Sequence, residues 1–173
     1  MQKGTMTSGD DSGSGALLTS TMYFSYSQFL VFDSSVQAPE CAPTRAHADQ
    51  GFARRTKSVL FGTLLDFGYA DLTVYAGPYV EKPEYERVIE VPLHVPSGEV
   101  RIKGPEEIKS ERSIKLDKGY YRLVAAQVVK EEEEIIDLFF EKVTGPLLRS
   151  RIWVADDRLK PPTPLLETVD ELP

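Results

Sequence analysis

The sequence has little cysteine, histidine or tryptophan and no long apolar run among its 173 residues. Its single cysteine, Cys41, permits no disulfide within the chain, which excludes a disulfide-rich secreted scaffold. His47 and His94 cannot alone supply the ligand set of the usual zinc site, so we expect no metal and no cofactor. Without a run of about 18 apolar residues, no transmembrane helix is expected.

Positive charge is also scarce. The chain has 20 Lys and Arg against 27 Asp and Glu, which gives a net charge of −7. Residues 58–173 hold 22 acidic and 15 basic side chains, so this part carries the whole net charge. Nucleic-acid binding requires a basic face that displaces counterions, and anionic membranes attract basic surfaces, so we expect neither partner. The first residues lack the apolar stretch of a secretory signal, which predicts a cytoplasmic protein.

Catalytic motifs are missing as well. The chain has no GxSxG elbow, no P-loop and no GxGxxG, and no protease motif surrounds Cys41. His94 is interpreted as a solvated side chain on the polar face of a strand, and the Asp156-Asp157 pair lacks the spacing of a calcium loop. A hydrolase whose carboxylates converge in space is a remaining hypothesis, with no particular pair indicated. We therefore predict a non-enzymatic protein.

Short apolar runs separated by turn residues predict an all-β fold. Alternating apolar and polar residues predict strands at 22–32, 58–65, 71–76, 87–95, 99–103, 112–116, 120–129, 135–142 and 149–155. Pro92 places the strand 87–95 at a sheet edge or beside a bulge. The one helical candidate lies within 44–55, with Thr44 as its cap and Gly51 ending or breaking it.

About eight or nine short strands with little helix predict an antiparallel β-sandwich, because each strand buries one face and needs a second sheet to cover it. An up-and-down barrel is the alternative. We expect a flexible Gly- and Ser-rich tail at 1–21, one sandwich domain at 22–158, and an extended proline-rich tail at 159–173.

Acidic side chains gather in two of the predicted loops, and we predict them as partner-contacting residues together with one tyrosine: Glu131, Glu132, Glu133, Glu134, Glu81, Glu84, Glu86 and Tyr85. One interpretation is a solvated surface that discourages pairing between sheet edges. The other is a surface that attracts a basic protein, such as a nuclease whose DNA groove is positive. In that case aromatic side chains supply most of the affinity, with Tyr79, Tyr85 and Tyr120 as candidates.

A different class of function is also open. A ligand- or carbohydrate-binding module would use exposed aromatics on one sheet face, for example Trp153 with Tyr121 or Tyr75. The simpler interpretation is that Trp153 covers the core at a sheet edge. The sequence leaves a homo-oligomer open.

Five stretches of the chain resemble the competence protein J family. They are SYSQFLVFD at 25–33, QGFARRTKSVLFGTL at 50–64, VIEVPLHVPSGEVRI at 88–102, IKLDKGYYRLVAAQ at 114–127 and VADDRLKPPTPLL at 154–166. The resemblance spans most of residues 23–166. It implies an all-β sandwich that binds and inhibits another protein, since the family is known for an inhibitor of a DNA-entry nuclease. It implies no catalytic residues.

Overall fold

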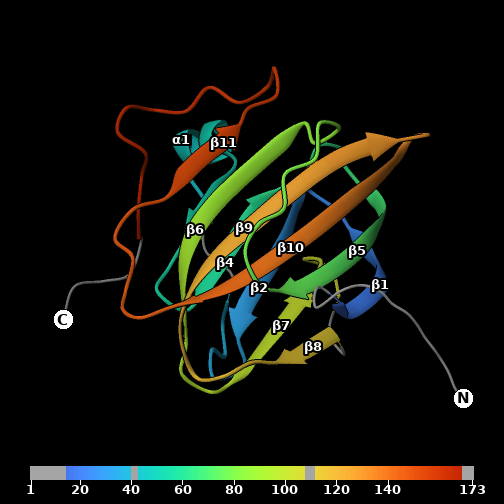
Figure 1. Cartoon of the computed structure of the whole chain (residues 1–173). Coiled ribbons are helices and arrows are strands. Elements are labelled where there is room, and N and C mark those ends of the chain that lie inside the picture. The colour runs from blue at the N-terminus through green and yellow to red at the C-terminus, as the bar shows by residue number, and fades with distance from the viewer. Residues whose placement is uncertain (1–14, 40–42, 108–111, 169–173) are drawn as a thin grey trace, which may run out of the picture.

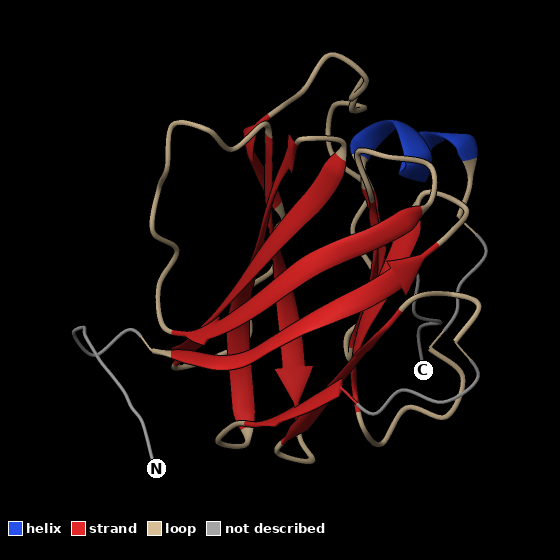
Figure 2. Cartoon of the chain, turned by 90° about the vertical axis from the view of Figure 1, so that its right-hand side faces the viewer, coloured by secondary structure: helices blue, strands red, loops and turns tan. Residues whose placement is uncertain are grey.

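The computed structural model describes residues 15–39, 43–107 and 112–168. Within these ranges the chain forms eleven strands and one short helix, and the strands make two sheets packed face to face (Figures 1 and 2). The six-stranded sheet has the order β1 (Ala16–Phe24), β5 (Gly68–Ala76), β10 (Glu133–Val143), β9 (Gly119–Lys130), β6 (Arg87–Val95) and β11 (Arg151–Val154). The five-stranded sheet has the order β3 (Phe52–Arg54), β4 (Ser58–Gly62), β2 (Gln28–Asp33), β7 (Glu99–Lys103) and β8 (Arg112–Lys115). The predicted all-β sandwich is confirmed, with more strands than expected.

The core lies between the sheets because alternate side chains of each strand point to one face. Its largest fully buried side chains include Phe24 and Phe140 from one sheet and Phe29 and Phe61 from the other. The outer face of the six-stranded sheet carries a second apolar cluster. There the segment 77–86 crosses over β9 and β10, which is the green connection in front of these strands in Figure 1. The six-stranded sheet is therefore partly covered on both faces.

One predicted strand is in fact two. The alternation at 22–32 predicts a single strand, but β1 and β2 are separated by a two-residue turn at Tyr26 and Ser27 with φ values of 56° and 57°. Phe24 faces the core from the six-stranded sheet and Phe29 faces it from the five-stranded sheet. The apolar pattern therefore continues through the turn and hides it.

The chain ends are more ordered than the sequence predicts. Residues 16–21, expected in a flexible tail, belong to β1, which pairs with β5. Residues 1–14 of that predicted tail lie outside the described residues. The C-terminal tail is extended but attached, because Gln50 exchanges two hydrogen bonds with the backbone of Leu166 (2.9 and 3.0 Å). Arg54 forms an ion pair with Glu167 (3.1 Å). Residues 169–173 lie outside the described part.

The local prediction at the helix is confirmed, whereas the one at Pro92 is not. Helix α1 (Arg45–Gln50) begins after Thr44, whose hydroxyl accepts a backbone hydrogen bond, and ends at Gly51 with a φ of 87°. The expectation at Pro92 is wrong, because β6 lies between β9 and β11 and pairs with β9 in an unbroken register through Pro92. Pro92 is tolerated there because the pairing of β6 with β11 covers only residues 88–90. In the described part of the chain, no helix is long and apolar enough to cross a membrane. The parallel pairing of β5 with β10 is not predicted by the sequence.

Candidate functional site

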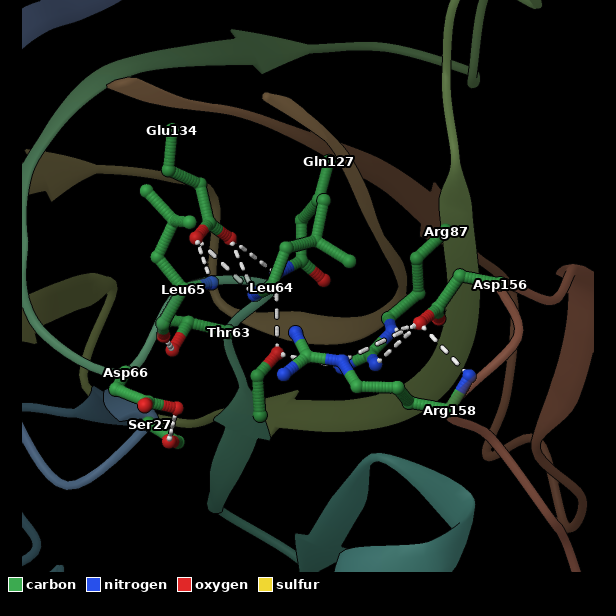
Figure 3. A network of polar contacts seen from close by, with 11 residues as sticks. Ser27, Thr63, Leu64, Leu65, Asp66, Arg87, Gln127, Glu134, Asp156 and Arg158 are labelled. Carbon is green, nitrogen blue, oxygen red and sulfur yellow. Dashed lines mark hydrogen bonds and ion pairs between the residues drawn. The ribbon is translucent and has the colours of Figure 1, made fainter. Parts of the chain in front are cut away.

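Two hairpin turns and one loop meet at one end of the sandwich. Loop 63–67, between β4 and β5, runs between the β1–β2 turn and the β9–β10 turn. On one side the Thr63 amide donates to the Ser27 carbonyl (2.9 Å), and the Ser27 amide donates to the Asp66 carbonyl (2.8 Å). On the other side the loop binds Glu134 of β10, as Figure 3 shows. The loop therefore joins the two turns into one surface.

Glu134 holds this loop from inside the protein. The side chain is fully buried, and its carboxylate accepts hydrogen bonds from the amides of Leu64 (2.9 and 3.0 Å) and Leu65 (2.9 Å) and from the side chain of Gln127 (2.9 Å). Burial raises the pKa of Glu134, while these donors and the nearby charge of Arg87 oppose the rise. Glu134 is thus a positioning residue for loop 63–67.

Polar contacts continue from Glu134 toward the C-terminal segment (Figure 3). The carbonyl of Gly62 accepts hydrogen bonds from the side chains of Gln127 (3.0 Å) and Arg87 (3.2 Å). Arg87 also donates two hydrogen bonds to Asp156 (2.6 and 3.1 Å). Burial alone would raise the pKa of Asp156, but the contacts with Arg87 bring it below its ordinary value. Asp156 is therefore engaged in the fold.

Exposed carboxylates surround this network. We refer to the following six residues as the acidic surface: Asp66, Glu84, Glu86, Glu131, Glu132 and Glu133. A hydrogen bond from Lys130 (3.0 Å) holds Glu84 beside the β9–β10 turn and lowers its pKa. Glu86 accepts a hydrogen bond from the Val129 amide (2.9 Å). Within the described part of the chain, no ion pair neutralises the three acids at 131–133. Glu81 is exposed halfway along the segment 77–86.

The β9–β10 turn displays its acids on a strained backbone. Glu131 and Glu132 have φ values of 50° and 68°, in the left-handed region where two-residue hairpin turns favour Asn-Gly. A residue with a Cβ atom in this region costs about 1–2 kcal/mol. The turn thus carries two exposed carboxylates at positions where Asn-Gly would make the folded protein more stable.

Replacing this pair with Asn-Gly (Glu131→Asn with Glu132→Gly) is expected to raise the free energy of unfolding by about 1 kcal/mol, because the strain is relieved. Urea denaturation measures the change. The matched control, Glu131→Gln with Glu132→Gln, removes the same charges without changing the backbone preference and should gain less. An Asn-Gly variant no more stable than this control would show that the turn stores no strain.

Two of the predicted partner-contacting residues are buried. Glu134 points inward, as described above, and Tyr85 is 5% exposed and donates a hydrogen bond to Asp137 (2.5 Å). Burial and the adjacent Asp137 raise the pKa of Tyr85. Tyr79 packs edge-on against Phe139 (5.5 Å between ring centroids), and Tyr120 lies at the opposite end of β9. Neither Glu134 nor Tyr85 therefore belongs to the acidic surface, which contains five of the predicted acids and Asp66.

Three exposed aromatic residues at this end were not predicted. Tyr26, Phe67 and Tyr69 are 74%, 68% and 64% exposed. A signal for two of them exists in the sequence, because Tyr26 lies between two serines and Phe67 lies between Asp66 and Gly68, in the gap between the predicted strands 58–65 and 71–76. A large apolar side chain inside a turn sequence has no strand to turn it inward, so exposure is the natural outcome.

The aromatic residues of the carbohydrate hypothesis are occupied. The Trp153 indole donates to Glu90 (3.0 Å), and the Arg151 guanidinium lies 3.8 Å from the centre of its ring. Tyr121 is 3% exposed, and Tyr75 stacks on Phe139 (5.1 Å). Trp153 remains 45% exposed, but Arg151 lies over its ring and Tyr121 is buried, so Trp153 and Tyr121 do not form the exposed aromatic pair that this hypothesis requires.

Of the remaining sequence candidates, His47 and Asp156 have structural contacts. Cys41 lies outside the described residues, and the Nδ1 atom of His47 accepts a hydrogen bond from the Thr44 amide at the start of α1 (3.0 Å). Within the described ranges, no group of three His, Cys, Asp or Glu side chains is placed to hold a metal ion. A groove of about 490 Å³ beside the β9–β10 turn is lined by Leu64, Glu86, Val129, Asp156, Asp157 and Arg158. In this groove Glu86 accepts the hydrogen bond from the Val129 amide, and Asp156 accepts those from Arg87.

Comparison with known proteins gives one family and two similar structures. A family model described as competence protein J (ComJ) matches residues 21–144. The crystal structure of ComJ from Bacillus subtilis, described as an inhibitor of the DNA degrading activity of NucA, is 22% identical with a TM-score of 0.65 and covers 75% of this chain and 98% of that one. A structure described as crocagin biosynthetic gene J is 17% identical with a TM-score of 0.52 and covers 73% and 97%. No curated protein matches the chain.

Proposed function

Because this chain belongs to the competence protein J family, we propose that it is a non-enzymatic inhibitor that binds a DNA-degrading nuclease and blocks the basic DNA groove of that enzyme with its acidic surface. The NucA inhibitor among the similar structures supports a nuclease as the partner. The proposal includes a cytoplasmic location and no direct binding to nucleic acid, in keeping with the net charge of −7.

One observation carries the acidic mechanism: the carboxylates at 131–133 are exposed and carry no neutralising ion pair within the described residues. A DNA-binding groove is positive because it must attract a phosphate backbone with one negative charge per about 1.7 Å of helix axis. A row of carboxylates offers the same groove a negative partner that it cannot cleave. Long-range attraction between the two surfaces raises the association rate.

The rigidity of the turn also supports this role. Glu131 and Glu132 lie in a two-residue turn between β9 and β10, which pair along their whole length. Glu134, the next residue but one, is held by the hydrogen bonds that it accepts from loop 63–67. Carboxylates on such a support are placed before the partner arrives, so less conformational entropy is lost on binding.

A DNA-degradation assay tests the proposed function. The purified protein is added in increasing amounts to two nucleases, Bacillus subtilis NucA and the NucA-type nuclease of the source organism. We expect the rate of DNA cleavage by the native partner to fall until one inhibitor is bound per nuclease. A cleavage rate that stays constant in molar excess of the protein, with both enzymes, would contradict inhibition.

A further inference from the structure

Exposed aromatic side chains gather at the same end of the sandwich as the acidic surface. Among the described residues, four aromatic side chains are strongly exposed, and three of them, Tyr26, Phe67 and Tyr69, lie at this end. The fourth, Trp153, is covered on its ring face by Arg151. Exposed aromatics grouped in one place are typical of interaction surfaces, whereas scattered ones are ordinary.

The three aromatic residues at this end lie close together. The hydrogen bonds between Ser27 and Asp66 hold the β1–β2 turn, with Tyr26, beside the loop that carries Phe67. Tyr69 pairs across strands with Tyr23, and their rings meet edge-on with centroids 5.3 Å apart. We call Tyr23, Tyr26, Phe67 and Tyr69 the aromatic patch.

The backbone under the patch is fixed. Tyr26 has a φ of 56°, which a non-glycine residue adopts at a cost, and the turn is nonetheless held on both sides of Ser27. Loop 63–67 is held by the Ser27 contacts at one flank and by the buried Glu134 at the other. The rings are thus presented on a rigid support, which favours tight binding because little order has to be created.

Negative charge lies around the patch. Asp66 precedes Phe67, and Asp71, which is exposed, shares the outer face of β5 with Tyr69. Because Glu134 pairs with Ala70 in the parallel register, the preceding residues Glu133 and Tyr69 face outward together. A second copy of this chain would bring like charges against one another, whereas a basic partner finds opposite charge at the rim.

We propose that the aromatic patch is the apolar centre of the nuclease-binding surface, with Phe67 and Tyr26 entering the floor of the enzyme's basic groove and the acidic surface forming the rim. This inference rests on the proposed function and adds to it the residues that determine affinity. Aromatic side chains in a desolvated centre contribute most of the binding energy, while rim charges act mainly on the rate of association.

Three single substitutions test the patch by surface binding kinetics against the NucA-type nuclease of the source organism. They are Phe67→Ser, Tyr26→Asn and Tyr69→Thr. Asparagine is chosen at position 26 because it tolerates the positive φ of the turn, and threonine at position 69 because it favours a strand. Each is expected to raise Kd roughly tenfold to a hundredfold, through faster dissociation and with an unchanged salt dependence of association. Phe67→Tyr should restore near wild-type binding.

The matched control is Leu148→Ser, because Leu148 is 78% exposed and its carbonyl contacts Arg54 at the other end of the sandwich. Unfolding curves of all variants establish that they are folded. If wild-type protein binds and the three variants dissociate no faster than the Leu148 control, the patch is not the binding centre, although the proposed function stands. If wild-type protein neither binds nor inhibits the nuclease, the proposed function fails and this inference fails with it.

Discussion

Replacing Glu131, Glu132 and Glu133 together with lysine is expected to slow association with the nuclease by a factor on the order of 10 to 100 at low ionic strength. The change brings the net charge of the chain from −7 to −1 and reverses the sign of the turn that faces the positive groove. Charges at the rim act mainly on encounter, so the dissociation rate should change less than the association rate. Glu134 is left intact because it is buried.

Stopped-flow measurements at several salt concentrations separate this effect from a loss of folding. Wild-type association should slow as salt is added, while association of the triple variant should hardly respond, because screening acts only on a charge attraction that is present. A matched pair of single variants controls for net charge: Glu132→Lys lies in the turn, and Asp117→Lys lies exposed at the opposite end of β9. Equal association rates for these two variants would remove the turn from the mechanism.

Replacing Glu134 with glutamine is expected to lower the free energy of unfolding by about 1–3 kcal/mol. The buried carboxylate accepts hydrogen bonds from three donor groups, on Leu64, Leu65 and Gln127. An amide at this position places an NH2 group, which only donates, where one carboxylate oxygen accepts hydrogen bonds from the Leu64 amide and the Gln127 side chain. Stability is lost because an unpaired buried donor costs more free energy than a typical hydrogen bond contributes.

The same variant should also weaken nuclease binding, although Glu134 lies beneath the binding surface. Loop 63–67 carries Asp66 and Phe67, and its backbone is held by Glu134. The matched control for stability is Glu133→Gln, the same chemical change one residue earlier on an exposed side chain, whose free energy of unfolding should stay within about 0.5 kcal/mol of wild type. A Glu134→Gln variant as stable as this control would show that the carboxylate does not hold the loop.

The sequence predicts those parts of the fold that depend on local patterns. The apolar alternation of residues 87–95 and the helix between Thr44 and Gly51 both have a short-range cause, and both are present. The edge or bulge expected at Pro92 is absent, because β6 lies between β9 and β11. The β1–β2 turn was missed because neither Tyr26 nor Ser27 is a usual residue for positive φ. The parallel pairing of β5 with β10 joins strands far apart in sequence, and no local pattern encodes such a pairing.

The candidate site shows the same division. The acids at 131–133 are exposed, as a charged hairpin predicts. Glu134 belongs to the same run of four glutamates, but it lies two residues before Ile136 and four before Leu138. Because alternate residues of a strand share one face, Glu134 lies on the core face with these two residues. The two-residue period of the strand therefore indicates that Glu134 is buried, although the run of acidic residues suggests that it is exposed. The aromatic patch could not be predicted, because it forms only when β1, β5 and loop 63–67 come together.

The most direct test of groove occlusion is the inhibition of the native nuclease at increasing concentrations of DNA. If the acidic surface occupies the groove that DNA would enter, the two ligands exclude each other. The concentration of inhibitor needed for half-inhibition should then rise in proportion to the DNA added, and saturating DNA should restore the full cleavage rate. A half-inhibition concentration that does not change with DNA would place the protein elsewhere on the nuclease and contradict the account.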